Sequence, residues 1–448
     1  MGADLGNLVG PFTFDPPTIS GGSVGLRYRI GTELVFTERI EFPFDLPDSP
    51  EVEQAVRVLH LVAGVSYYKC IAPATLVLPA LTVAERRLVT VLYDEGLREF
   101  AYRNGLGVPL PVELSTPPGL ADPPVVSLRG TGALVPIGGG KDSALVAALV
   151  PDGQLFAVNP VGAHVHLAEA LRRPLLGVKR ILDPQLRELV AAGAPNGHVP
   201  VTAITSAISV LTAVALGLRD VLMGIERSAD EPSLVTKDGV AVNHQFSKSW
   251  AAEHLLRAVF APIGVQYLSL LRPLTELAIG AGVARRGLAA EIVSCNRVFT
   301  VWNENTSSKE QRPCGECAKC LFTALMIAPS TSPSAIERQY GRALLDEAGH
   351  IEPVRELWSE EKPFDCVGER LETAAALVLL SRTAAWKDQA VVVALAGEAS
   401  RLLEAAGVEA SSFLSVGPVE ILPPDYQAVV AGLAPDLAAV PGLVGVSR

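Results

Sequence analysis

Charged and aromatic residues are both scarce in this chain, and their scarcity excludes several classes of protein. Only 19% of the 448 residues are charged and 6% are aromatic, and acidic residues outnumber basic ones by 48 to 37. A net charge of −11 excludes a broad basic surface that follows a nucleic-acid backbone, so we expect no nucleic-acid partner. The apolar fraction of 49% is too high for a disordered chain, and we expect a folded globular protein.

The sequence also lacks a recognisable leader and a clear membrane span. Residues 1–10 contain no basic segment followed by an apolar one, which a secretion signal requires. The most apolar stretch, residues 201–218, is interrupted by Thr and Ser, and we predict a buried helix there. We therefore expect a cytoplasmic protein with no membrane partner, and the sequence leaves its oligomeric state open.

Cysteines are few, but four of the six are clustered. Cys314, Cys317 and Cys320 are spaced C-x₂-C-x₂-C, and eighteen residues separate Cys295 from Cys314. Four thiolates can close a tetrahedral Zn²⁺ site, which leaves no open position for catalysis, so we predict a structural zinc. An iron-sulfur cluster and free thiols are the alternatives. Cys70 and Cys366 are predicted to be buried free thiols.

Composition shifts divide the chain into three regions, and we predict an α/β fold class. Residues 1–114 read as an α+β domain, with short antiparallel strands up to residue 42 and helices over 50–69 and 82–104. Ser49 and Pro50 are predicted to be the N-cap and the first residue of the first helix. A proline-rich linker covers 115–126. Residues 127–330 read as a parallel-sheet domain, and residues 331–448 as mostly helical, with helices at 334–349, 369–382 and 389–407. The predicted parallel strands are 133–137, 155–158, 175–181 and 220–225.

Three consecutive glycines and a Lys-Asp-Ser lie between two apolar runs in ALVPIGGGKDSALVAALV, residues 133–150. Between a strand and a helix, such a loop can bind phosphate, because the free N–H groups and the dipole of the helix attract anions. The alternative interpretation is a plain glycine-rich turn. A Walker A loop fails because Asp142 follows Lys141, and a dinucleotide fingerprint fails because residue 143 is Ser. The predicted phosphate-binding residues are Gly138, Gly139, Gly140, Lys141, Asp142 and Ser143.

Further polar residues follow the predicted strands, where parallel sheets place ligand-binding groups. The segment after strand 220–225 contains Glu226, Arg227 and Ser228, which we predict to line a nucleotide or substrate cleft. The segment VNHQFSKSW, residues 242–250, is unusually rich in hydrogen-bond donors, and a solvated loop is its alternative interpretation. His and Lys are natural general acids and bases. The predicted groups here are His244 and Lys248 for proton transfer, with Asn243, Gln245 and Arg272 for substrate binding.

Taken together, these motifs resemble known enzyme families. The GGGKDS motif is similar to the PP-loop of ATP pyrophosphatases, usually S-G-G-x-D-S, with Gly138 in place of the usual Ser. The CGxCxxC pattern also occurs in PP-loop enzymes that make 7-cyano-7-deazaguanine. The segments AGVSYYK, NGHVPVTAI, VNHQFSKS and KPFDCVGE add a more specific resemblance, to the MurL family of UDP-N-acetyl-α-D-muramoyl-L-alanyl-L-glutamate epimerases.

This resemblance implies a reaction and its cofactors. It implies inversion of the terminal L-Glu of UDP-MurNAc-L-Ala-L-Glu to D-Glu through an acyl-adenylate, with ATP and Mg²⁺ required and AMP and diphosphate released. From motif position alone, we predict that the loop holds the phosphates, with Lys141 also a catalytic residue. Arg272 is predicted to neutralise a substrate carboxylate or the diphosphate of the UDP group. A PP-loop ligase that adenylates another carboxylate and a non-catalytic nucleotide-binding protein are the alternatives.

Overall fold

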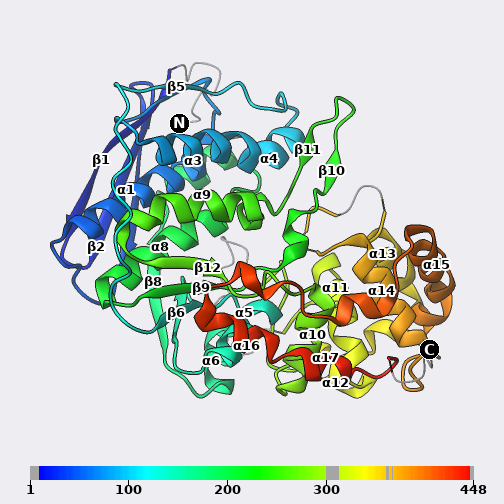
Figure 1. Cartoon of the computed structure of the whole chain (residues 1–448). Helices are drawn as coiled ribbons and strands as arrows, with labels where there is room; N and C mark the ends of the chain where they lie inside the picture. Colours follow the sequence, from blue (N-terminus) through cyan, green and yellow to red (C-terminus); the bar gives the residue numbers. More distant parts are fainter. Residues whose placement is uncertain (1–9, 299–311, 360–362, 366, 444–448) are drawn as a thin grey trace.

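A single ten-stranded sheet passes through the first 269 residues of the chain (Figure 1). The computed structural model describes residues 10–298, 312–359, 363–365 and 367–443. The strands lie in the order β12-β9-β6-β7-β8-β3-β2-β1-β4-β5. Five strands form a parallel half, and the other five form an N-terminal half that begins with an antiparallel meander. The predicted α/β class is confirmed. The sheet is larger than predicted, because it extends across two of the predicted domains.

The parallel half confirms the four predicted strands and adds a fifth. Its members are β6 (Ala133–Pro136), β7 (Gln154–Val158), β8 (Leu175–Ile181), β9 (Asp220–Met223) and β12 (Gln266–Ser269). The chain starts at the central β6, adds β7 and β8 on one side, and then adds β9 and β12 on the other. The order reverses between β6 and β9, and the carboxyl ends of strands at such a reversal are where open α/β sheets bind ligands.

Helices cover both faces of this parallel half. Alternate side chains of each strand point to opposite faces, so Leu134 and Phe156 belong to one core and Val135 and Leu155 to the other. The helices are α5 (Lys141–Leu149), α6 (Gly162–Ala170), α7 (Gln185–Ala191), α8 (Val201–Leu216) and α9 (Trp250–Phe260). As predicted, the apolar stretch at 201–218 is a helix, and most of its length is buried. A small hairpin, β10 (Leu234–Val235) and β11 (Ala241–Val242), lies outside the main sheet (Figure 1).

The N-terminal half contains the predicted antiparallel strands. They are β1 (Phe12–Ser20), β2 (Ser23–Ile30) and β3 (Leu34–Glu41), and β4 (Thr75–Val77) and β5 (Glu113–Ser115) extend the sheet in parallel. Ser49 caps α1 (Pro50–Ala63), with Pro50 in its first turn as predicted, and α2 (Val65–Tyr68) follows. The single helix predicted over 82–104 is wrong. It is α3 (Val83–Asp94), a 3₁₀ turn and α4 (Arg98–Arg103), because Asp94 leaves helical geometry just before Gly96.

The two halves of the sheet meet where β3 pairs antiparallel with β8. At this junction the Arg180 guanidinium on β8 donates from Nε to Glu38 on β3 at 2.7 Å. Glu38 is completely buried, and the Arg180 side chain is only 10% exposed. One hydrophobic core includes residues of both halves, and α1 packs against α8. Residues 117–132 form a largely exposed connection. The domain boundary at 115–126 stays a prediction, but the sheet and its core are continuous across it.

Every regular element described after Ser269 is helical. These helices are α10 (Glu276–Arg285), α11 (Ala318–Ile327), α12 (Pro333–Tyr340), α13 (Ile351–Glu356), α14 (Arg370–Ser381), α15 (Ala390–Ala406), α16 (Pro424–Ala431) and α17 (Ala434–Ala438). The helix predicted over 334–349 is too long, because Gly341 ends α12 with φ of 74°. None of the described helices combines the length and apolarity needed to cross a lipid bilayer. Near the end of the chain α16 returns to the sheet, where Tyr426 donates to Asp220 on β9 (Figure 1).

Candidate active site

The glycine loop joins β6 to α5, so the predicted strand-loop-helix arrangement is confirmed. The loop is fixed by short-range hydrogen bonds: the Gly138 N–H donates to Ser143 Oγ at 3.0 Å, and the Ser143 hydroxyl donates to the Gly140 carbonyl at 3.2 Å. Gly139 has a φ of 76°, which favours glycine. No side chain caps the N-terminus of α5. The backbone here therefore forms a loop in which N–H groups precede and begin a helix, the arrangement that binds anions.

Lys141, the first residue of α5, is almost completely buried among carboxylates. Its ammonium contacts Asp142 and Glu276, and the carboxylates of Asp142, Glu226 and Glu276 lie within 4.8 Å of one another. Burial lowers the pKa of Lys141, but these three carboxylates outweigh burial and raise it above its ordinary value, so the amine stays protonated. The three acids begin α5, follow β9 and begin α10, at the carboxyl ends of three neighbouring strands.

The segment after β9 is tied down by internal contacts. Ser228 donates to the Glu226 carboxylate at 3.2 Å, and Arg227 lies 3.6 Å from Glu369. The buried Arg272 guanidinium donates to the Glu253 carboxylate at 2.7 Å and to the carbonyls of Glu226 and Lys248 at 2.9 and 2.6 Å. These bonds fix two segments of the site to one another, and they use three of the five N–H groups of Arg272. The substrate-binding role of Arg272 stays a prediction.

The predicted proton-transfer segment forms a second cluster. It ends in a 3₁₀ turn, η4 (Phe246–Lys248), and Lys248 Nζ donates to Gln245 Oε1 at 3.3 Å. Asn243 donates to the Ala229 carbonyl, and the Gln245 side chain donates to the Val367 carbonyl. His244 Nδ1 lies 2.5 Å from Glu99 Oε2 on α4. The imidazole ring of His198 lies 4.3 Å from that of His244, centroid to centroid.

A C-terminal segment, residues 367–370, connects the two clusters. Val367 accepts from Gln245 of the His244 cluster. A Cβ on Gly368 would lie 2.7 Å from Glu276 Cγ and 3.2 Å from Ser228 Oγ, so only glycine allows the chain to pass this close to the acidic cluster. The candidate site therefore combines residues from the sheet, the N-terminal helices and the C-terminal helical region.

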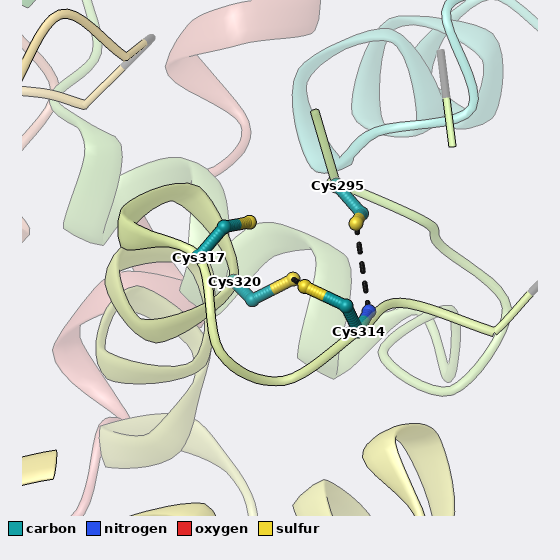
Figure 2. Close-up of side chains that lie close together, drawn as sticks. All are labelled: Cys295, Cys314, Cys317 and Cys320. Atoms are coloured by element: carbon teal, nitrogen blue, oxygen red, sulfur yellow. Dashed lines mark hydrogen bonds between the residues drawn. The ribbon is translucent and has the colours of Figure 1, made fainter. Parts of the chain in front are cut away.

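The four clustered cysteines converge beside the glycine loop (Figure 2). Their sulfur atoms lie within 4.8 Å of one another, and Cys314 Sγ is 3.8 Å from Cys320 Sγ. Four sulfurs bound ~2.3 Å from a tetrahedral ion are ~3.8 Å apart, so this donor set fits Zn²⁺. The Cys314 N–H points at Cys295 Sγ at 3.5 Å, and Gly315 with φ of 71° permits the turn between Cys314 and Cys317. Cys70 is buried as predicted, whereas Cys366 lies outside the described residues.

The cysteine cluster is attached directly to the loop. The Val293 N–H donates to the Gly139 carbonyl at 2.8 Å, and a Cβ on Gly140 would lie 2.8 Å from Ser294 Oγ. The Ser294 carbonyl is in turn 3.7 Å from Cys320 Sγ. A group bound by the four sulfurs would therefore also fix the segment with Val293 and Ser294, which supports the glycine loop.

Sequence reasoning missed two acidic residues of this site, Glu99 and Glu276. Each lies in a helix, where an isolated Glu is normally a solvated surface residue, yet the structure buries both. No local pattern marks them, because the partners that make them important, His244 and Lys141, are more than a hundred residues away in the chain. His198 lies in the NGHVP segment, which the sequence marked without giving it a role.

Two family models match the chain: the MurL N-terminal domain over residues 9–270 and the MurL C-terminal domain over residues 291–410. The chain belongs to the MurL family. Three curated relatives are each 40% identical to it, and all are named UDP-N-acetyl-alpha-D-muramoyl-L-alanyl-L-glutamate epimerase. The family resemblance inferred from the motifs is confirmed, and these relatives are by name epimerases, which are isomerases.

The MurL relatives match over most of their length. The Salinispora tropica protein aligns over 92% of this chain and 92% of its own, and the Micromonospora sp. protein over 89% and 91%. The protein of Xanthomonas oryzae pv. oryzae aligns over 81% and 83%. No solved structure matches the chain.

Proposed function

We propose that this MurL-family chain converts the terminal L-Glu of UDP-MurNAc-L-Ala-L-Glu to D-Glu, with ATP consumed and AMP and diphosphate released, during synthesis of peptidoglycan precursors. The observation that carries the proposal is the glycine loop with buried Lys141 at the carboxyl end of β6, in a chain whose relatives are named for this epimerisation. An epimerase would need ATP because the Cα proton of the substrate is only weakly acidic, so the carboxylate beside it must first be activated.

Activation of the carboxylate is the first proposed step. Removing a proton beside a free carboxylate places a second negative charge next to the first. A substrate carboxylate oxygen therefore attacks the α-phosphorus of ATP, the bond to the bridging oxygen breaks, and diphosphate leaves. The acyl-adenylate has no carboxylate charge, so the electron pair left on Cα delocalises as an enolate that fixed donors stabilise.

Proton transfer at Cα is the second step, and we assign it to His244 and Lys248. One group takes the proton from Cα and the other returns a proton to the opposite face, which inverts the centre. Water then attacks the acyl carbonyl, and AMP leaves. A positioned acid and base contribute roughly 10²- to 10⁴-fold to such a step. Asn243 and Gln245 are proposed substrate contacts, and Arg272 is proposed to hold the two backbone segments in place through its three protein acceptors.

Two metal ions fit the donors present. Asp142, Glu226 and Glu276 offer the oxygen ligands that Mg²⁺ prefers, and three carboxylates around one lysine leave an excess of negative charge when all are ionised. We propose that these acids hold Mg²⁺, which offsets the charge of the diphosphate when it is bound. We also propose that Cys295, Cys314, Cys317 and Cys320 hold a structural Zn²⁺, because their sulfur spacing suits a closed tetrahedral site.

We further propose that the parallel half of the sheet is a PP-loop ATP-binding fold. Its support is the position of the loop, which follows the first parallel strand at the point where the strand order reverses. The acidic residues that follow β9 and β12 lie at the same edge of the sheet. A nucleotide bound there would have its phosphates at the N-terminus of α5.

The decisive experiment incubates the full chain with UDP-MurNAc-L-Ala-L-Glu, ATP and Mg²⁺ in D₂O. We expect D-Glu that carries deuterium at Cα, with AMP and diphosphate formed in the same reaction. AMP without deuterium at Cα would indicate a ligase that adenylates a carboxylate, and ATP binding without turnover would indicate a non-catalytic protein. Either result would refute the proposed epimerisation.

A further inference from the structure

Three elements far apart in the sequence bring one carboxylate and two imidazoles together, with Glu99 and His244 buried and His198 partly buried. Glu99 comes from α4, His198 from the segment before α8, and His244 from the segment before η4. One ligand-type atom of each lies within 4.8 Å of the others. The sequence predicted a role for His244 alone, and the roles of the other two follow only from their positions.

Glu99 is placed to fix the tautomer of His244. Its Oε2 atom lies 2.5 Å from Nδ1 of His244, and the carboxylate is buried. Burial raises the pKa of Glu99, but the hydrogen bond and charge of His244 outweigh it and lower the pKa below its ordinary value. An ionised carboxylate accepts a hydrogen bond from Nδ1–H, which leaves the lone pair of a neutral His244 on Nε2. The same carboxylate stabilises the imidazolium that forms when His244 takes a proton.

His198 is placed to remain neutral beside that pair. Burial, and then the positive charge on His244, lower the pKa of His198 to about 3. The two imidazoles, 4.3 Å apart, therefore take up at most one proton over the ordinary pH range, and His198 stays neutral. That separation also leaves no room for a substrate between the rings, so both rings would lie on the same side of a bound substrate. Proton transfer on the opposite side then needs another group.

We propose that Glu99 and His198 are positioning residues that prepare His244 for proton transfer, with Glu99 fixing its tautomer and stabilising its charged form and His198 limiting the pair to one proton. This inference rests on the proposed epimerisation. It gives His244 one face of Cα and leaves the opposite face to Lys248, whose ammonium is held by Gln245 on the same turn.

A metal held by the same three residues is the competing interpretation, and the geometry is against it. Two ligand atoms ~2.1 Å from one tetrahedral ion are ~3.4 Å apart. The observed separation of Glu99 Oε2 and His244 Nδ1 is 2.5 Å, which is a short charge-assisted hydrogen bond.

Several other charged groups face the cluster and contribute to its titration. Arg103 on α4 contacts Glu99, and the charges of Lys69 and Lys248 lower the pKa of His198. Burial raises the pKa of Asp365, and the charge of His244 acts against that rise, so this carboxyl is near enough to affect His244 in return. The test therefore compares each variant with the wild-type protein, in which these four groups are unchanged.

The experiment measures proton uptake and chemistry separately. The chain has seven histidines, so ¹³C-labelled imidazoles can be titrated individually by NMR in the substrate-free full chain. We expect His244 in Glu99→Gln to lose its proton at lower pH than in the wild type, and the rate of Cα deuterium exchange to fall by roughly 10²-fold. In a plot of the exchange rate against pH, we expect the acidic limb to shift in the same direction as the titration of His244. In His198→Asn, the titration of His244 should stay close to that of the wild type, because His198 is already neutral over the ordinary pH range.

The controls are the exposed residues Glu188→Gln and His254→Asn, which are expected to change neither measurement. Glu99→Asp, which keeps the charge, restores much of the His244 titration. If Glu99→Gln does not fold, Glu99→Ala, which also removes the charge, takes its place. An unchanged His244 titration in folded Glu99→Gln overturns the inference, as does a bound transition metal that both site variants lose. If the wild type exchanges no Cα proton while Glu99 still shifts the His244 titration, the proposed epimerisation fails and the coupling of the two residues stands.

Discussion

At the scale of single residues, the candidate site depends on where a Cβ atom can be accommodated. A Cβ on Gly140 would lie 2.8 Å from Ser294 Oγ, and one on Gly224 would lie 2.9 Å from the backbone of Asp142. Nothing lies within 4 Å of a Cβ on Gly138. Gly138 of the loop therefore faces open space, whereas Gly140 and Gly224 are each packed too closely against another segment to accept a side chain.

Gly138→Ala should therefore separate phosphate binding from folding. The new methyl group enters open space, so we expect thermal stability close to that of the wild type, but it blocks close approach of a phosphate to the backbone. ATP affinity, measured by calorimetry, should fall by about tenfold or more, a loss of ~1.4 kcal/mol. Gly224→Ala is the contrasting variant, since its contact with Asp142 destabilises the fold. Unchanged ATP affinity in Gly138→Ala would exclude this loop as the phosphate site.

At the scale of elements, the C-terminal helices support the site from behind. Glu372 on α14 is completely buried, and its carboxylate accepts from the Leu277 N–H in the first turn of α10 at 3.0 Å. Burial, followed by the charge of Glu369, raises the pKa of Glu372 to about 8. The start of α10, which also carries Glu276, is thus held by a carboxyl that is protonated at neutral pH.

Glu372 makes stability depend on pH, with a predictable sign. The folded chain keeps this proton up to about pH 8, whereas the unfolded chain releases it near the ordinary pKa of 4.5. Protonated Glu372 therefore contributes to the free energy of unfolding fully below pH 4.5. This contribution is lost as pH rises through 8, at about 1.4 kcal/mol per pH unit. In urea unfolding between pH 5 and 8, Glu372→Gln should lose less stability with rising pH than the wild type. The exposed control Glu404→Gln should follow the wild type, and parallel curves for Glu372→Gln would contradict this assignment.

The cysteine cluster acts at the same scale, because it joins α11 to the segment that supports the glycine loop. We expect about one Zn²⁺ per chain in protein purified without chelators, and Cys317→Ser should lose most of it and unfold at a lower temperature. Metal content is measured by mass spectrometry, with Cys70→Ala as the control that retains the metal. Iron together with acid-labile sulfide would identify the alternative cluster, and absence of any metal would exclude both.

At the scale of the whole molecule, the β3–β8 pairing unites parts that the sequence separates. Arg39, Ile40 and Glu41 pair with Ile181, Arg180 and Lys179, and the Arg180–Glu38 ion pair is buried at the same place. The His244 cluster depends on this union, because Glu99 belongs to the N-terminal half. We therefore expect that cutting the chain between the halves does not divide the protein into independent units.

Cleavage in the exposed connection tests this directly. A protease site introduced within residues 118–122 should be cut readily, because most of that segment is exposed. The two fragments should then elute as one species in size-exclusion chromatography, since the shared sheet and core hold them together. The uncut chain is the control. Separate elution of the two fragments under native conditions would show that residues 1–114 form an independent domain.

The sequence by itself predicted the features whose signals are local. The parallel strands, the Ser49 cap, the glycine loop and the spacing of four cysteines each follow from neighbouring residues, because hydrogen bonding and side-chain periodicity act over a few positions. Its errors were also local, since the breaks at Gly96 and Gly341 ended helices that periodicity alone would have continued.

Only the tertiary structure decided which charges are buried together. Glu99 and Glu276 look like ordinary surface residues in the sequence, and Arg272 looks like a ligand for an anion. Folding buries all three and gives each a partner in the protein, because a charge removed from water must be compensated by a nearby group. The partners come from segments far apart in the chain, and only the paths of the sheet and its helices bring them together.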